Sequence, residues 1–212
     1  MEQSSEQLLY GYDPLCGWCF AFRPTMAAVR AAFPDLPITL VMGGLVVGER
    51  VAPVSQSREY LISGLEQVRR TAGVSAGDAF YGGLLKEGTY ISNSEPPCRA
   101  VYVAQQLASQ HAYAFADALP EAYYVHGLPL DDASVLAELA TQHGIDGEAL
   151  VHHWQSDAAK QGVQQAFREA RAAGFNSYPT LAYQRGERAQ MVGHYMRPEQ
   201  AVAQIATLRA AW

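Results

Sequence analysis

Two cysteines three positions apart, Cys16 and Cys19, stand at the boundary between an apolar run and a segment with helical spacing. The run 8–12 predicts a strand, and Asp13-Pro14 predicts the turn that follows it. A helix that begins at the first cysteine places its sulfur near the positive end of the helix dipole, which favours a thiolate. One helical turn separates the two sulfurs, so the second can displace the first from a mixed disulfide. The pattern therefore predicts thiol–disulfide exchange with Cys16 and Cys19 as the catalytic pair.

A zinc site is the first alternative for such a pair. Structural zinc sites take four ligands at recognisable spacing, and the only further cysteine in the sequence is Cys98, far along the chain. His152 and His153 are adjacent, so they point to different sides of a helix and make poor joint ligands. A pair with a structural or incidental role is the second alternative. We expect redox chemistry, with no metal and no bound organic cofactor.

The composition fits a globular enzyme with a core of its own. The chain has 212 residues, 49% of them hydrophobic, and a net charge of −6. The negative charge disfavours a nucleic-acid partner, and no apolar stretch is long enough to span a bilayer. The polar residues 1–7 lack the basic and apolar regions of a secretory signal, and an odd number of cysteines disfavours a disulfide-stapled secreted scaffold. We therefore expect a cytoplasmic protein that binds neither nucleic acid nor a membrane.

Apolar periodicity divides the chain into three parts. The first part has expected strands at 8–12 and 38–47, the second of them buried on both faces. A helix is expected between them over 16–33, kinked or broken at Pro24. Together these elements form a βαβ unit with a right-handed crossover.

The middle of the chain has a helical pattern throughout. Helices are expected over 59–71, 95–109, 112–126, 132–143 and 146–155, with a kink or two short helices at Pro120. The last part has an expected helix over 158–173, a hairpin of strands 180–183 and 190–192, and a helix from Pro198. The order is therefore βαβ, a helical block, then αββα.

Three stretches of the sequence resemble the DsbA-like thioredoxin superfamily, in particular its FrnE-like branch of protein-disulfide isomerases. They are residues 12–19 (YDPLCGWC), the Gly43-Gly44-Leu45 segment, and the helical block that ends at 131–144. The resemblance extends over residues 8–208. It implies an α/β, thioredoxin-like fold with an inserted all-helical domain. Residues 1–50 and 158–212 would form the discontinuous thioredoxin-like domain, and residues 51–157 the insertion.

The same resemblance implies a cis-proline loop opposite the cysteines, at Tyr178-Pro179-Thr180. The backbone N–H and C=O of Tyr178 would then face outward and pair with an extended substrate segment. Pro179 has no N–H, so it removes a competing donor near the sulfurs. Together with Gly17 and Trp18 between the cysteines, these three residues form the expected substrate-binding set.

Three further positions have two interpretations each. Asp13 starts a turn, or it is buried beneath the site and accepts a proton from Cys19. Trp18 offers an exposed apolar contact to substrate, or it packs against the helical block. Cys98 is a small buried hydrophobic residue, or it is a thiol activated by a helix N-terminus that regulates or partners the main pair.

The expected function is that of a thiol–disulfide oxidoreductase, a disulfide reductase or isomerase that works by mixed-disulfide exchange. Its substrate would be a protein or a small molecule with a thiol or disulfide. Its electron donor would be glutathione or a dithiol protein, and its oligomeric state a monomer or homodimer.

Two other functions stay open. The first is a glutathione-dependent transferase or isomerase of the kappa or hydroxychromene-carboxylate isomerase type, whose members typically lack the dithiol. The second is a non-catalytic, chaperone-like module that binds through an aromatic groove between the domains. Burial in the core is the more common role for such aromatic residues, here Tyr113, Phe115, Tyr123 and Tyr124.

Overall fold

The computed structural model describes residues 6–212, so residues 1–5 of the expected first domain lie outside the described part. Its strands are β1 (Glu6–Tyr12), β2 (Ile38–Met42), β3 (Ala52–Pro53), β4 (Ile91–Ser92), β5 (Thr180–Arg185) and β6 (Arg188–Gly193). Its helices are α1 (Gly17–Ala32), α2 (Arg58–Ala72), α3 (Leu85–Glu87), α4 (Glu95–Leu107), α5 (Ser109–Tyr124), α6 (Ala133–Gln142), α7 (Gly147–Trp154), α8 (Asp157–Ala172) and α9 (Pro198–Ala211).

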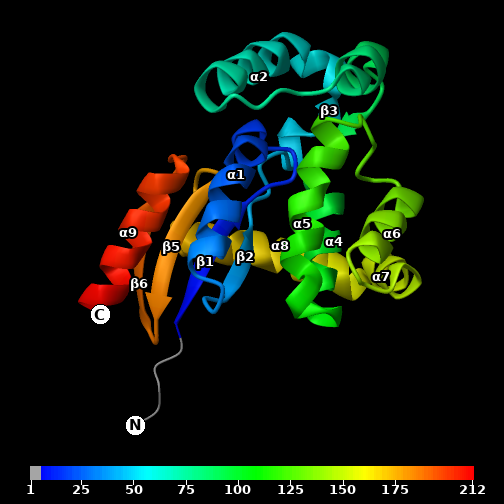
Figure 1. Cartoon of the computed structure of the whole chain (residues 1–212). Coiled ribbons are helices and arrows are strands. Elements are labelled where there is room, and N and C mark those ends of the chain that lie inside the picture. The colour runs from blue at the N-terminus through cyan, green and yellow to red at the C-terminus, as the bar shows by residue number, and fades with distance from the viewer. Residues whose placement is uncertain (1–5) are drawn as a thin grey trace.

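A sheet with the strand order β2-β1-β5-β6 forms the centre of the fold (Figure 1). β1 pairs in parallel with β2 and antiparallel with β5, and β5 pairs antiparallel with β6. The register brings Gly11 near the end of β1 opposite Thr180 at the start of β5. The turn that follows β1 and the proline that precedes β5 therefore meet at the same end of the sheet.

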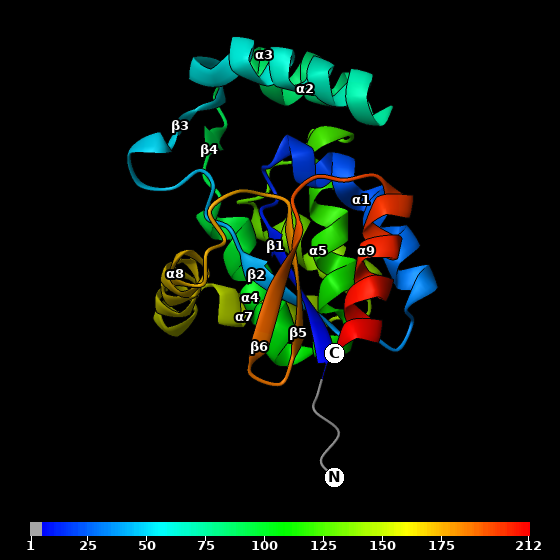
Figure 2. The same cartoon turned by 90° about the vertical axis from the view of Figure 1, so that its left-hand side faces the viewer.

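Helices cover both faces of this sheet. Figure 2 shows α1 and α9 on one side and α8 on the other. Leu8, Tyr10 and Tyr12 alternate along β1 and are buried on one face, as the period of a strand requires. On the other face, Leu9 packs against a small buried cluster of Ala170, Phe175 and Ala182. The βαβ start and the αββα end that the sequence predicts are both confirmed.

The segment between β2 and α8 is mostly helical. Helices α4 and α5 pack against one another, α4 also contacts α7 and α8, and α5 contacts α1. Residues 52–92 form an arm that carries α2 and α3, and the short β3–β4 pair joins the two ends of this arm. One cluster of buried residues runs through both the sheet and the helical segment. The division of the chain into domains at residues 50 and 158 stays a prediction.

Several local expectations need correction. The second strand ends at Met42 rather than at residue 47, because Gly44 has a φ of 59° and turns the chain out of the sheet. Its Thr39 is exposed, so this strand is not covered on both faces along its whole length. Helix α1 continues through Pro24 and α5 through Pro120, so the breaks at these prolines are wrong, whereas a kink at either proline stays a prediction. Periodicity did not reveal the two-residue strands β3 and β4 or the short helix α3.

Within residues 6–212, none of the helices combines the length and the apolar character that crossing a membrane requires.

Candidate active site

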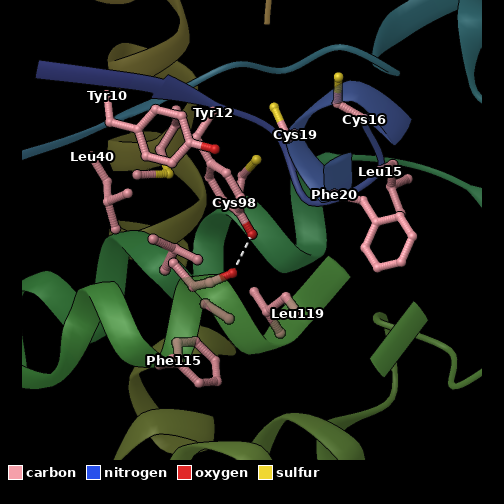
Figure 3. Packing of buried hydrophobic residues seen from close by; sticks show 14 of the residues in the cluster. Tyr10, Tyr12, Leu15, Cys16, Cys19, Phe20, Leu40, Cys98, Phe115 and Leu119 are labelled. Carbon is pink, nitrogen blue, oxygen red and sulfur yellow. Dashed lines mark hydrogen bonds between the residues drawn. The ribbon is translucent and has the colours of Figure 1, made fainter. Parts of the chain in front are cut away.

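The first turn of α1 carries both cysteines of the motif. Cys16 is the N-cap residue, its N–H donates to the carbonyl of Asp13, and its own carbonyl accepts from the N–H of Phe20. Figure 3 shows the Cys16 sulfur pointing away from the packed side chains beneath it. Cys16 keeps 5% of its surface exposed, whereas Cys19 keeps 0%. An incoming disulfide can therefore meet Cys16 first, with Cys19 behind it.

The loop before β5 lies directly against the outer sulfur. The Tyr178-Pro179 peptide bond is cis, which confirms the expectation for this loop. The thiol of Cys16 donates a hydrogen bond of 3.3 Å to the carbonyl oxygen of Tyr178. The Tyr178 phenol reaches the carbonyl of Gly43 at 2.8 Å, and a Cβ on Gly43 would lie 2.9 Å from the Tyr178 ring. A glycine at the exit of β2 therefore gives this loop the space to approach the motif.

Burial separates the two thiols of the pair chemically. It raises the pKa of Cys19 well above its usual range, and a hydrogen bond with Cys16 and the charge of the Cys16 thiolate raise it further. Cys19 therefore stays protonated at neutral pH, and the outer, less buried sulfur is the one that a substrate meets first. This order suits a two-step exchange in which the outer sulfur attacks and the inner sulfur acts afterwards.

Asp13 is fully buried beneath the turn, and it also makes the hydrogen bond expected of an aspartate that starts a turn. One carboxylate oxygen accepts from the N–H of Leu15 at 3.0 Å, as in a turn that an aspartate initiates. The other accepts from the N–H of Leu45 at 2.6 Å, which ties the turn to the segment after β2. Burial raises the pKa of Asp13 to about 6, although these hydrogen bonds oppose the shift.

The thiol of Cys98 donates a hydrogen bond to the Asp13 carboxylate. The Cys98 sulfur lies 3.9 Å from Oδ2 of Asp13, and burial raises the pKa of Cys98 well above its usual range. The prediction that Cys98 is buried is confirmed by its exposure of 0%. Its surroundings are partly polar, because it shares the carboxylate with Ser94, whose hydroxyl donates to Asp13 at 2.9 Å. The proposed role of Asp13 as a proton acceptor for Cys19 stays a prediction.

The loop between β6 and α9 adds residues that the sequence did not point to. Trp18 is half-buried, and its ring packs at a tilted angle against the ring of Tyr195 in this loop, with the ring centroids 5.0 Å apart. The Nδ1 atom of His194 lies 2.8 Å from Oγ1 of Thr180 and 3.0 Å from Oγ of Ser177. This loop therefore contacts the predicted substrate-binding set at two places. Tyr195 contacts Trp18 between the cysteines, and His194 contacts Thr180 of the cis-proline loop.

The arm of residues 52–92 reaches the other side of the motif. Gly17 lies below Leu65 and Val68 of α2, because a Cβ on Gly17 would lie 3.6 Å from Cδ2 of Leu65 and 4.0 Å from Cγ2 of Val68. The Tyr124 phenol donates a 2.6 Å hydrogen bond to the carbonyl of Leu15, one residue before Cys16. The half-buried Gly17 is therefore lined by the arm, and no periodicity in the sequence indicates this contact.

The aromatic residues of α5 belong mainly to the core. Phe115, Tyr123 and Tyr124 are buried, as expected. Tyr113 is half-buried, and the guanidinium of Arg30 lies 4.6 Å from its ring centroid. Within residues 6–212, no three or more His, Cys, Asp and Glu side chains gather in a way that could hold a metal ion.

Comparison with known proteins gives this geometry a context. Residues 10–205 match the DSBA-like thioredoxin domain. The cytosolic disulfide reductase DsbM from Pseudomonas aeruginosa superimposes with a TM-score of 0.81 at 26% identity, over 97% of this chain and 100% of that one. The structure of DsbM with GSH gives a TM-score of 0.78 at 25% identity, over 96% of this chain and 99% of that one.

A proposed protein disulfide isomerase from Nitrosomonas europaea gives a TM-score of 0.84 at 24% identity, over 98% of each chain. No curated protein sequence matches the chain. The α/β thioredoxin-like fold of the DsbA type, with a helical insertion, is thereby confirmed.

Proposed function

Since the chain belongs to the DSBA-like thioredoxin domain family of disulfide oxidoreductases, we propose that it reduces disulfides through Cys16 and Cys19 by mixed-disulfide exchange. One observation carries the proposal: the outer sulfur of the pair donates to the Tyr178 carbonyl at 3.3 Å, while the inner sulfur is fully buried behind it. A first thiol at the surface end of the pair and a second thiol enclosed behind it suit a two-step exchange.

In the first step, the Cys16 thiolate attacks one sulfur of a substrate disulfide. A bond forms between Cys16 and that sulfur, the substrate disulfide breaks, and the other sulfur leaves as a thiolate that takes a proton. In the second step, Cys19 loses its proton and attacks Cys16. The mixed disulfide breaks, the second substrate thiol leaves, and a Cys16–Cys19 disulfide remains. Two electrons pass from the protein to the substrate.

The cis-proline loop supplies the binding surface for this reaction. With the carbonyl of Tyr178 beside the reactive sulfur, an extended substrate segment can align along the loop, as in strand addition. Gly17, Trp18, Pro179 and Thr180 complete the proposed surface, and His194 supports it through its contact with Thr180.

A reductive direction has support from the comparisons. DsbM is a cytosolic disulfide reductase whose structure has been solved with GSH. We propose the same direction for this chain in the cytoplasm, with glutathione or a dithiol protein as the donor that reopens the Cys16–Cys19 disulfide. No bound cofactor is required, because the two sulfurs carry the electrons. The proposed substrates are small molecules or proteins with a disulfide.

Redox titration tests this proposal. The protein is equilibrated in glutathione buffers of different ratios, free thiols are alkylated, and intact and peptide masses are measured. We expect one reversible two-electron transition, with the loss of two alkylated sites at Cys16 and Cys19. Cys16→Ser and Cys19→Ser variants are the controls and should lose the joint transition at two sites, with at most one site per molecule forming a mixed disulfide with glutathione. A wild-type pair that never closes at any glutathione ratio would contradict the proposal.

A further inference from the structure

Helix α2 lies over the N-terminal end of α1, where the reactive cysteine is located (Figures 1 and 2). The arm that carries α2 leaves and rejoins the rest of the molecule at one place, because β3 and β4 pair Ala52 with Ser92 and Pro53 with Ile91. The arm is therefore a single unit joined to the molecule at this strand pair. Its helix α2 contacts α1, the helix that begins at the cysteine motif.

The side of α2 that faces the motif is apolar. Leu65 and Val68 are its buried residues, with exposures of 4% and 2%. They lie at van der Waals distance from the position of a Cβ on Gly17, the residue directly after Cys16. Elsewhere on the helix, Tyr60 is 79% and Ile62 is 46% exposed. The helix therefore presents its apolar, close-packed side to the active site.

The position of the arm is fixed by contacts to Tyr124. The Phe80 ring of the arm packs on the Tyr124 ring with a centroid separation of 5.3 Å, and the N–H of Gly77 donates to the Tyr124 carbonyl at 2.9 Å. The Tyr124 phenol in turn binds the carbonyl of Leu15 at 2.6 Å. Tyr124 thus contacts both the arm and the backbone that carries Cys16. These contacts help to hold α2 in place over the N-terminal end of α1.

Cys16 therefore lies between the cis-proline loop and helix α2. The Tyr178 carbonyl is 3.3 Å away on one side, and Leu65 and Val68 cover the adjoining Gly17 on the other. With Cys16 only 5% exposed, a disulfide must approach with its S–S bond aligned on the attacking sulfur. A short, slender disulfide can approach in that way, whereas a disulfide in the surface of a folded protein brings neighbouring backbone against α2.

We infer that Leu65 and Val68 of α2 are specificity-determining residues, which restrict the dithiol to low-molecular-weight disulfides and exclude disulfides of folded proteins. The inference rests on the proposed function, because it names the substrate class of the same two sulfurs. The reaction is the exchange described above, in which a small disulfide RSSR accepts two electrons and two protons and leaves as two RSH molecules.

A single-turnover experiment separates this inference from the proposed function. Reduced protein is mixed with bis(2-hydroxyethyl) disulfide or with native insulin, and closure of the Cys16–Cys19 disulfide is followed by rapid alkylation and mass. Per mole of oxidant, we expect the small disulfide to close the wild-type pair at least about a hundredfold faster than insulin does. In the Leu65→Ala/Val68→Ala variant, the insulin rate should rise about tenfold, while the small-disulfide rate stays within about threefold.

Two further sets of variants serve as controls for this experiment. Ile62→Ala removes an exposed apolar side chain of the same helix and should change neither rate. If the double variant does not fold, the single variants Leu65→Ala and Val68→Ala give the same comparison, with smaller rises in the insulin rate. Equal wild-type rates for the two oxidants, or an unchanged ratio in folded variants, would overturn the inference alone. A wild-type pair that neither oxidant closes would instead overturn the proposed function, and the inference with it.

Discussion

The Ser94 hydroxyl donates a 2.9 Å hydrogen bond to Oδ1 of Asp13, although 81 positions separate the two residues in the chain. The same hydroxyl oxygen accepts from the N–H of Val46 at 2.9 Å. The carboxylate also accepts from the N–H groups of Leu15 and Leu45 and from the thiol of Cys98. A buried carboxylate therefore joins the turn before Cys16, the segment after β2 and the start of α4.

Replacement of Ser94 tests this junction. Ser94→Ala leaves the N–H of Val46 without its acceptor and removes one donor to Asp13, so we expect the free energy of unfolding to fall by about 2 kcal/mol. Urea denaturation measures the change. Ser109→Ala, at an exposed position, is the matched control and should change stability by less than about 0.5 kcal/mol. Equal effects of the two substitutions would contradict the structural role of Ser94.

The stability of the protein should depend on pH through Asp13. Burial raises the pKa of Asp13 to about 6 in the folded protein, so the folded state holds this proton to a higher pH than the unfolded state does. The resulting stabilisation is complete below the ordinary aspartate pKa and is lost as the pH rises through about 6. Between about pH 4.5 and about pH 7.5, we expect the contribution of Asp13 to fall by about 2 kcal/mol.

Comparison with Asp13→Asn isolates this contribution from other titrating groups. The amide cannot ionise, so the difference in unfolding free energy between wild type and variant should shift by that amount between the two pH values. The variant should still be less stable than wild type at the lower pH, because its NH₂ group faces a backbone N–H where a carboxylate oxygen accepted a bond. A pH-independent difference would show that Asp13 does not titrate in this range.

Tyr124 should affect both stability and reaction rate. Tyr124→Phe keeps the ring against Phe80 but leaves the Leu15 carbonyl without its phenol donor, so we expect a loss of about 1 kcal/mol in unfolding free energy. Closure of the dithiol by a small disulfide should slow by a few fold, because the backbone before Cys16 becomes less constrained. Tyr60→Phe, at an exposed position of α2, is the control and should leave both quantities unchanged.

Cys98 should not take part in the exchange. It is fully buried and burial raises its pKa, so its reactive thiolate is scarce at neutral pH. In Cys98→Ala we expect the same reduction potential for the Cys16–Cys19 pair and a loss of about 1 kcal/mol in stability. Peptide mapping of oxidised wild-type protein should find Cys98 as a free thiol. A disulfide that includes Cys98 would contradict this account.

The sequence predicted the active-site turn well because its determinants are local. The apolar run before Asp13, the proline after it and the helical spacing beyond Cys19 all lie within a few residues of one another. The hairpin of β5 and β6 was predictable for the same reason. The sequence left a kink or a break open at the prolines of α1 and α5, and the break is wrong: Phe22 and Met26 are buried on either side of Pro24, and this burial overrides the local preference for a break.

Contacts between distant segments could not be read from the sequence. Ser94 precedes Pro96-Pro97, which marks the start of a helix, but nothing in that pattern shows that its hydroxyl binds a carboxylate near the N-terminus. The contact of Trp18 with Tyr195 and the cover that α2 forms over Gly17 are likewise set by tertiary packing. Periodicity identifies which face of a helix is buried and does not identify the partner of that face.

Trapping of the mixed disulfide tests the central claim most directly. Reduced Cys19→Ser protein is mixed with bis(2-hydroxyethyl) disulfide, and the product is located by intact mass and peptide mapping. The account predicts a stable adduct of one hydroxyethylthio group on Cys16, because the inner sulfur that would displace it is absent, and no adduct on the Cys16→Ser variant in the same time. An adduct on Cys98 with Cys16 unmodified, or no adduct at all, would contradict the account.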